Sequence, residues 1–179
     1  MDRVTVSQAP PAFALPAALV SQGYRLRPET EADIPFLMRL FASTRADELA
    51  STPWTPEQKA AFVAQQFEAQ RYHYYNRLEN CRFAVIEHGG EAIGRLYLQE
   101  TPTKIHLVDI ALTPERRGGG LGTAILEALL ALAGTGGRRV DIFVEKFNPA
   151  LNLYRRLGFR EIKDAEVYWE MEWLPETVS

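Results

Sequence analysis

The stretch of sequence that decides the fold reads LVDIALTPERRGGGLGT and spans residues 107–123. An apolar strand runs into a turn with three consecutive glycines, and a leucine-rich helix follows at once. The first amides of a helix have no partner within the helix, and the helix dipole favours an anion there. Glycines also let a ligand approach the backbone closely because no Cβ intervenes. The stretch therefore predicts a strand–turn–helix unit that holds a phosphorylated ligand.

Two common phosphate-binding loops do not match this turn. A P-loop requires Gly-Lys followed by Ser or Thr, and this combination occurs nowhere in the chain. The dinucleotide fingerprint G-x-G-x-x-G fails at its sixth position, whether it is started from Gly118 or from Gly120. The pattern that matches is R-x-x-G-x-G, formed by Arg117, Gly120 and Gly122.

A second motif lies downstream at residues 148–159 and reads NPALNLYRRLGF. Together with the R-x-x-G-x-G turn and the Leu-Thr-Pro that precedes it at 112–114, this motif resembles the GNAT superfamily of acyl-CoA-dependent N-acyltransferases. In that family the glycine turn grips the coenzyme A pyrophosphate. The two motifs cover about residues 104 to 159, in the family's order and separation.

The resemblance implies a mixed α+β fold. Its centre is a mostly antiparallel, twisted sheet of about six or seven strands with helices on both faces, in the order β-αα-βββ-α-β-α-ββ. Hydrophobic alternation and turn signals agree with this order. The sequence predicts strands at 24–27, 82–86, 92–98, 105–112, 140–144, 159–162 and 167–173, and helices that start near 30, 55, 121 and 148.

Length and composition predict one globular domain. We expect residues 1–22, which are broken by prolines, to form an extended arm, and residues 23–179 to form a single GNAT-like domain. A net charge of −3 gives no basic field for nucleic acid, and no apolar run is long enough to span a membrane, so a cytoplasmic location is expected. The single cysteine, Cys81, excludes an internal disulfide and is expected to be a core residue. Three scattered histidines give no metal signature, so no metal is expected.

The resemblance implies two candidate catalytic residues. Tyr154 matches the family's usual tyrosine, and its phenol could donate a proton to the departing thiolate; the alternative is a packing tyrosine. Counted back from Arg117, His106 falls where relatives place a histidine or glutamate that acts as general base. A histidine that is merely hydrogen-bonded within the strand, a base acting through water, or no base at all are the alternatives. Regular alternation would place His106, Val108, Ile110 and Leu112 on one face, and Asp109 on the other as a structural residue.

The resemblance also implies which residues bind the acyl donor, acetyl-CoA. A backbone N–H of the strand would stabilise the oxyanion, and two asparagines match positions that contact the cofactor. Asn148 could instead be a plain helix cap, and Arg117 a solvated surface side chain. The expected contacts come from Ile110, Ala111, Leu112, Arg117, Gly118, Gly119, Gly120, Leu121, Gly122, Thr123, Asn148 and Asn152.

The expected activity is N-acetyl transfer from acetyl-CoA to a primary amine on a small molecule or a peptide, by direct attack in a ternary complex. The acceptor pocket is expected near the connection of the first two helices. There Glu48 could attract a cationic amine and Trp54 could wall the pocket. A homodimer is possible, as in many relatives. The alternatives are a non-catalytic acyl-CoA-binding sensor or interaction module, and an unrelated nucleotide-phosphate binder.

Overall fold

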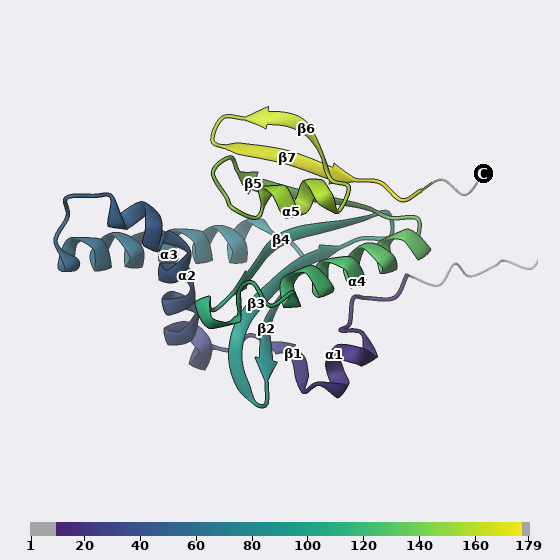
Figure 1. Cartoon of the computed structure of the whole chain (residues 1–179), viewed down its shortest axis with the longest axis horizontal. Coiled ribbons are helices and arrows are strands. Elements are labelled where there is room, and N and C mark those ends of the chain that lie inside the picture. The colour runs from purple at the N-terminus through teal and green to yellow at the C-terminus, as the bar shows by residue number, and fades with distance from the viewer. Residues whose placement is uncertain (1–9, 177–179) are drawn as a thin grey trace, which may run out of the picture.

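A computed structural model describes residues 10–176 of the chain. Its centre is a seven-stranded sheet in the order β1-β2-β3-β4-β5-β7-β6 (Figure 1). Neighbouring strands are antiparallel except β4 and β5, which are parallel. The strands are β1 (Tyr24–Pro28), β2 (Cys81–His88), β3 (Glu91–Glu100), β4 (Lys104–Leu112), β5 (Arg139–Glu145), β6 (Arg160–Ala165) and β7 (Tyr168–Trp173). The helices are α1 (Ala17–Ser21), α2 (Ile34–Ala50), α3 (Pro56–Arg77), α4 (Leu121–Thr135) and α5 (Leu151–Arg156), with short 3-10 turns η1 (Glu31–Asp33) and η2 (Pro114–Arg116).

The predicted fold class is confirmed. The mixed α/β architecture, the seven mostly antiparallel strands and the order of elements from β1 onward agree with the expectation from sequence. Local signals explain the agreement. At the start of α3, for example, the Thr55 side chain accepts a hydrogen bond from the amide of Gln58, and the Gln58 side chain accepts one from the amide of Thr55.

The N-terminal segment differs from the expected extended arm. Residues 17–21 form the short helix α1, and Phe13 and Leu19 are buried in the main core. The chain is held at this point by polar contacts as well, because the Phe13 amide donates to Glu100 and the carbonyl of Pro11 accepts from the buried Arg138. Residues 1–9 of the expected arm lie outside the described residues.

The two faces of the sheet have different partners. On β3, Leu96 and Leu98 point into the main core, which also holds the apolar sides of α1, α4 and α5. Arg95 and Tyr97 alternate with them and therefore face the other side, where α3 lies. A second, smaller core joins α2 and α3 through Leu37, Phe41, Leu49, Val63 and Phe67.

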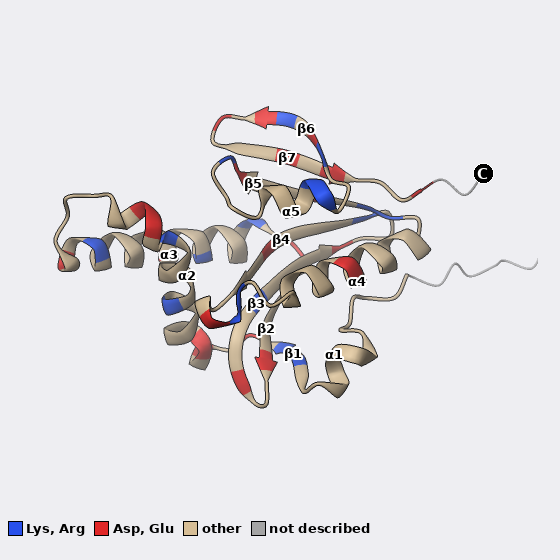
Figure 2. Cartoon of the chain, in the orientation of Figure 1, with Lys and Arg blue, Asp and Glu red and all other residues tan. Residues whose placement is uncertain are grey.

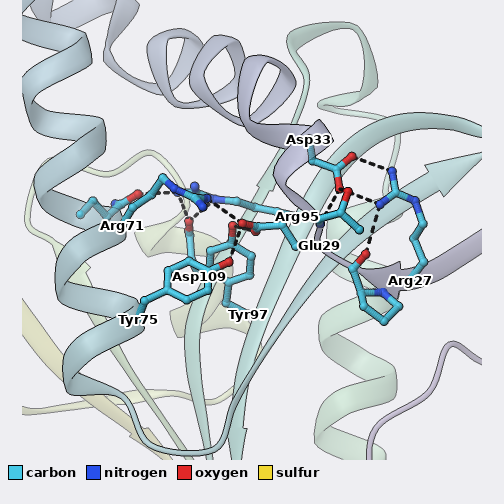
Figure 3. A network of polar contacts seen from close by, with 11 residues as sticks. Arg27, Glu29, Asp33, Arg71, Tyr75, Arg95, Tyr97 and Asp109 are labelled. Atoms are coloured by element: carbon cyan, nitrogen blue, oxygen red, sulfur yellow. Dashed lines mark hydrogen bonds and ion pairs between the residues drawn. The ribbon is translucent and has the colours of Figure 1, made fainter.

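A buried polar network attaches α3 to the sheet (Figure 3). Glu29, just after β1, has a side chain that is only 1% exposed. Its Oε1 accepts hydrogen bonds from Arg71 and Tyr75 of α3, each at 2.7 Å, and its Oε2 accepts one from Tyr97 of β3. A buried carboxylate is costly unless its oxygens are satisfied, so these donors fix the position of α3 over β1 and β3.

Gly94 allows β3 and β4 to approach each other closely. A Cβ on Gly94 would lie 2.8 Å from a methyl group of Leu112 and closer still to the carbonyl oxygen of Ala111. We predict that Gly94→Ala lowers the free energy of unfolding by about 1–3 kcal/mol, because the backbone of β4 must shift to make room. Chemical denaturation of the purified protein measures this change.

Gly119→Ala is the matched control for this prediction. No heavy atom lies within 4 Å of a Cβ at Gly119, whose φ is not positive, so the free energy of unfolding should stay within about 0.5 kcal/mol of the wild type. Equal stability of the two variants would show that close approach at Gly94 is not a constraint on this fold.

Candidate active site between strands β4 and β5

Strands β4 and β5 pair over only four residues each. The pairing starts at Lys104 with Arg139 and ends at Leu107 with Ile142. Beyond this point β5 pairs only with β7, and β4 pairs only with β3. The edge of β4 over residues 108–112 therefore presents backbone N–H and C=O groups that β5 does not satisfy, and such groups need other partners. We call this place, where the two strands part, the β4–β5 opening.

A β-bulge at Val108 changes which side chains of β4 share a face. Tyr97 of β3 is opposite Asp109, but the next residue, Leu98, is opposite Leu107, so Val108 is the extra residue. Asp109 lies opposite Ile110 and Leu112, as expected, but the expectation that His106 shares the face of Ile110 and Leu112 is wrong. His106 and Asp109 lie on the α3 face of the sheet, whereas Leu107 and Leu112 belong to the main core.

The glycine turn ends against the start of α4. Gly118 and Gly120 have φ values of +76° and +86°, which favour glycine, and Gly120 is the N-cap residue of α4. Within residues 10–176, no side chain caps this helix, so its first amides remain available for a ligand. A Cβ at any of the three glycines from 118 to 120 would point into open space. The backbone of the turn is therefore open to contact by a bound group.

Arg117 is positioned at the junction of three elements. Its Nε donates to the carbonyl of Leu112 at 2.9 Å and one terminal nitrogen donates to Ser43 of α2 at 2.8 Å. The guanidinium thus ties the end of β4 to α2, a role that neither the phosphate-binding nor the solvated-surface interpretation anticipated. Arg117 directly precedes the glycine turn, and Figure 2 shows basic residues just ahead of α4.

Asn148 and Asn152 lie around the start of α5. The Asn148 side chain accepts a hydrogen bond from the Ala150 amide at 2.9 Å, which is a local capping contact. Asn152 is exposed on α5 and contacts Arg155. The helix begins at Leu151, three residues later than expected, because residues 148–150 form the turn that leads into it.

Tyr154 of α5 is buried in the main core, where its ring packs edge-on against Phe159 with centroids 5.7 Å apart. Within residues 10–176 the Tyr154 hydroxyl makes no hydrogen bond. The fully enclosed side-chain atoms that lack a partner there belong to Arg82 and Arg138. Tyr154 as a whole is 4% exposed. Burial, and to a smaller extent the charge of Asp109, raises the pKa of Tyr154 above its usual value, so the phenol stays protonated.

His106 is held by an aspartate on the neighbouring strand. Its Nδ1 lies 2.9 Å from Oδ1 of Asp141, which is its register partner on β5, and its ring packs edge-on against Phe143. Lys104 contacts the other oxygen of Asp141 at 3.1 Å. Burial of Asp141 opposes its charge, but the hydrogen bonds and charges of His106 and Lys104 outweigh burial and lower the pKa of Asp141. This arrangement fixes the orientation of the ring, and among residues 10–176 Nε2 of His106 has no hydrogen-bond partner.

Asp109 and Arg95 form a second ion pair on the same face. The Nε of Arg95 donates to Oδ2 of Asp109 at 2.7 Å, and Gln70 of α3 accepts from another nitrogen at 2.9 Å (Figure 3). The sequence analysis missed both Arg95 and Asp141. The available signal was a single charge inside an apolar strand, as in AIGRLYL and VDIFV.

Glu48 and Trp54, the predicted acceptor-pocket residues, lie in the last turn of α2 and just after that helix. Glu48 lies within α2, is exposed and contacts Arg45, which in turn contacts Glu145 of β5. Trp54 follows α2 and its ring packs on Phe62, in the N-terminal part of α3. A surface hollow of about 330 Å³ there is lined by Trp54, Gln58, Ala61, Phe62 and Gln65.

Comparison with known proteins identifies the family. The model of the acetyltransferase (GNAT) family matches residues 44–159. An N-alpha-acetyltransferase of Sulfurisphaera tokodaii is 30% identical over 120 residues, which cover 56% of this chain and 72% of that protein. A mycothiol acetyltransferase of Actinosynnema mirum is 45% identical over 56 residues, but these cover 30% of this chain and only 19% of that protein.

Solved structures show the same fold. The PaiA N-acetyltransferase from Thermoplasma acidophilum, crystallised with coenzyme A, has a TM-score of 0.62 at 18% identity and covers 84% of this chain and 98% of its own. An acetyltransferase from Thermus thermophilus has a TM-score of 0.60 at 23% identity, with 84% and 96% covered. The chain belongs to the GNAT family and is an acetyltransferase.

Residues 10–176 contain neither a candidate membrane-spanning helix nor a candidate metal-binding cluster. No helix there is both long and apolar enough to cross a bilayer. No group of three or more His, Cys, Asp or Glu side chains in that range is arranged to hold a metal ion.

The contacts of Asp141 predict a pH-dependent contribution to stability. A carboxylate whose folded-state pKa is lowered stabilises the fold above its unfolded pKa of about 3.9, and this contribution disappears as the pH falls through the folded-state pKa. We predict that Asp141→Asn lowers the free energy of unfolding at pH 6 and that its deficit shrinks on going to pH 3. Denaturant titrations at both pH values measure it, and a deficit that grows toward pH 3 would contradict the assignment.

Proposed function

We propose that this acetyltransferase transfers the acetyl group of acetyl-CoA to a primary amine of a small molecule or a peptide, by direct attack in a ternary complex. The observation that carries the proposal is the β4–β5 opening. Its main-core side has the glycine turn and Tyr154, and its α3 side has His106 and Asp109. Donor and acceptor could therefore reach the same strand edge from opposite faces of the sheet.

The glycine turn is suited to the diphosphate of the donor. No side chain of residues 10–176 caps the first amides of α4, the space at the Cβ positions of residues 118–120 is open, and the helix dipole adds positive potential. Gly119 is informative because neither crowding nor a positive φ requires a glycine at this position. Close approach by a bound group explains it.

The edge of β4 can serve the thioester. A strand backbone at Ile110–Leu112 without a β5 partner could hydrogen-bond the pantetheine arm, and one N–H could stabilise the negative charge that develops on the carbonyl oxygen. Fixed backbone donors need no reorganisation during the reaction, which is why such contacts lower the barrier effectively.

Three side chains could then take part in proton transfer. His106, oriented by Asp141, accepts a proton from the amine through its Nε2. The amine nitrogen attacks the thioester carbonyl, a C–N bond forms and the C–S bond breaks. Tyr154 gives its proton to the departing sulfur.

Direct transfer agrees with the state of Cys81. Burial raises the pKa of this thiol to about 11, so almost no thiolate is present at neutral pH. Cys81 begins β2, outside both motifs, and it is a poor candidate for an acyl-enzyme intermediate.

The names of the relatives support an amine acceptor but differ in its size. The relative from Sulfurisphaera tokodaii is named for N-alpha-acetylation, and that from Actinosynnema mirum for the small molecule mycothiol. A non-catalytic acyl-CoA-binding module would keep the glycine turn without needing the His106–Asp141 pair, so the catalytic proposal is favoured.

Release of free thiol from acetyl-CoA across a panel of alkylamines and peptide amines tests the proposal. We expect thiol release that depends on the amine, and a rise in melting temperature with acetyl-CoA but not with ATP, because only a ligand that binds the native state stabilises it. Stabilisation without thiol release for any amine would favour the binding module. Stabilisation by ATP but not by acetyl-CoA would favour a nucleotide-phosphate binder.

The open backbone of the glycine turn predicts that Gly119→Val weakens donor binding. The added side chain would enter the open space over the turn, so the Kd for acetyl-CoA should rise at least about 10-fold, the equivalent of about 1.4 kcal/mol. Isothermal titration calorimetry measures it. Ala131→Val, at an exposed position on α4, is the control and should bind like the wild type. Wild-type affinity in Gly119→Val would exclude contact between the donor and this part of the turn.

The role of Tyr154 predicts a selective loss of turnover. Tyr154→Phe keeps the buried ring and removes only the hydroxyl, so kcat should fall by about 100-fold while the Kd for acetyl-CoA changes little. Steady-state kinetics and calorimetry on the same preparation measure both quantities. An unchanged kcat between pH 6 and pH 9 would show that Tyr154 only packs against Phe159.

A further inference from the structure

Asp109 of β4 uses only one of its two carboxylate oxygens for its charged partner. Both Arg95 nitrogens that contact Asp109 approach the same oxygen, Oδ2. Within residues 10–176, Oδ1 of Asp109 has no hydrogen-bond donor. In contrast, Glu29 uses Oε1 for Arg71 and Tyr75 and Oε2 for Tyr97.

Two buried aspartates, Asp33 and Asp141, follow the pattern of Glu29. Asp33 binds two nitrogens of Arg27 with its two oxygens (Figure 3), and Asp141 binds His106 with one oxygen and Lys104 with the other. The Asp109 side chain is also 24% exposed, whereas its partner Arg95 is 4% exposed. A counter-ion whose only task was to neutralise Arg95 would be expected to use both oxygens for it, because bidentate Arg–carboxylate pairing is the stronger geometry.

Asp109 lies where the acceptor must arrive if the proposed function is correct. The bulge at Val108 turns its side chain to the α3 face, the face of His106, and it follows directly on the last residues at which β4 and β5 pair. Its charge contributes to raising the pKa of Tyr154, so the carboxylate is also near that hydroxyl. Tyr97, the register partner of Asp109 on β3, packs edge-on against Tyr74 of α3 with centroids 5.9 Å apart.

We propose that Oδ1 of Asp109 receives the ammonium group of the acceptor, so that the site selects amines that are cationic at neutral pH, and that Arg95 positions this carboxylate. The inference rests on the proposed function and names the acceptor class for it. An alkylamine with a pKa of about 10.4 arrives protonated, and moving its charge out of water is costly unless an anion meets it. His106 on the same face then accepts the proton before the nitrogen attacks.

The test compares two acceptors in the wild type and in Asp109→Asn. One is a primary alkylamine, which is cationic at pH 7.5; the other is an aromatic amine of similar size, which is uncharged at that pH. We expect the KM for the alkylamine to rise about 10- to 100-fold in Asp109→Asn, which is the value of a hydrogen bond to a charged group. The KM for the aromatic amine and the Kd for acetyl-CoA should stay within about twofold. Glu127→Gln removes an exposed carboxylate on α4 and should change neither KM.

A second variant covers the case in which the unpaired, buried Arg95 prevents Asp109→Asn from folding. Arg95→Met combined with Asp109→Asn removes both charges and should show the same selective rise in KM. The wild type alone gives a third readout. A trimethylammonium analogue of the alkylamine should inhibit competitively, and its uncharged tert-butyl isostere should inhibit at least about 10-fold more weakly.

Failure of this inference is distinguishable from failure of the proposed function. If the wild type releases no thiol with any amine, the proposed function fails. If it acetylates amines, but Asp109→Asn raises both KM values equally or neither, or the two isosteres inhibit equally, the function stands and Asp109 does not bind the acceptor ammonium.

Discussion

The early end of the β4–β5 pairing is the constraint on which the site depends. Two parallel strands that could have paired along their whole lengths pair over four residues and then take different partners. Close contact at Gly94 keeps β4 against β3, and β5 continues along β7 through Glu145. Unpaired backbone groups inside a sheet are costly, so the edge of β4 needs a hydrogen-bonding partner, and a ligand can supply it.

The bulge at Val108 converts this opening into a site with chemically different sides. Without it, regular alternation would send Asp109 to the main core, where an ionised carboxylate would be unfavourable. With it, His106 and Asp109 both lie on the α3 face, each fixed by a charged partner, Asp141 and Arg95 respectively. The opposite side keeps the buried ring of Tyr154, whose pKa is raised by burial. A general base and a proton donor can thus work at neutral pH on opposite sides of one strand.

Much of the fold could be predicted from sequence because its signals are local. The Thr55–Gln58 capping pair, the glycine turn and the apolar periodicity of α4 each depend on residues a few positions apart. The two motifs were sufficient to indicate the family, which the comparisons confirm. The expected start of the last helix was three residues early because Asn148 caps a turn, and a cap looks the same in sequence whether the helix begins at once or after that turn.

The features that were missed depend on contacts between distant segments. The bulge at Val108 is visible only in the register of β4 against β3, and the partner of His106 is Asp141, 35 residues further along the chain. Arg117 similarly reaches Ser43 of α2, 74 residues away. No pattern in a single sequence states which isolated charges in apolar strands will pair, so the faces of His106 and Asp109 had to come from the structure.

A crystal structure of the chain with acetyl-CoA tests the central claim most directly. The account predicts the diphosphate on the amides at the start of α4, the pantetheine arm along residues 110–112 of β4, and the sulfur within hydrogen-bonding distance of the Tyr154 hydroxyl. Acetyl-CoA bound elsewhere, or β4 and β5 paired through residues 108–112 with the donor excluded, would contradict it.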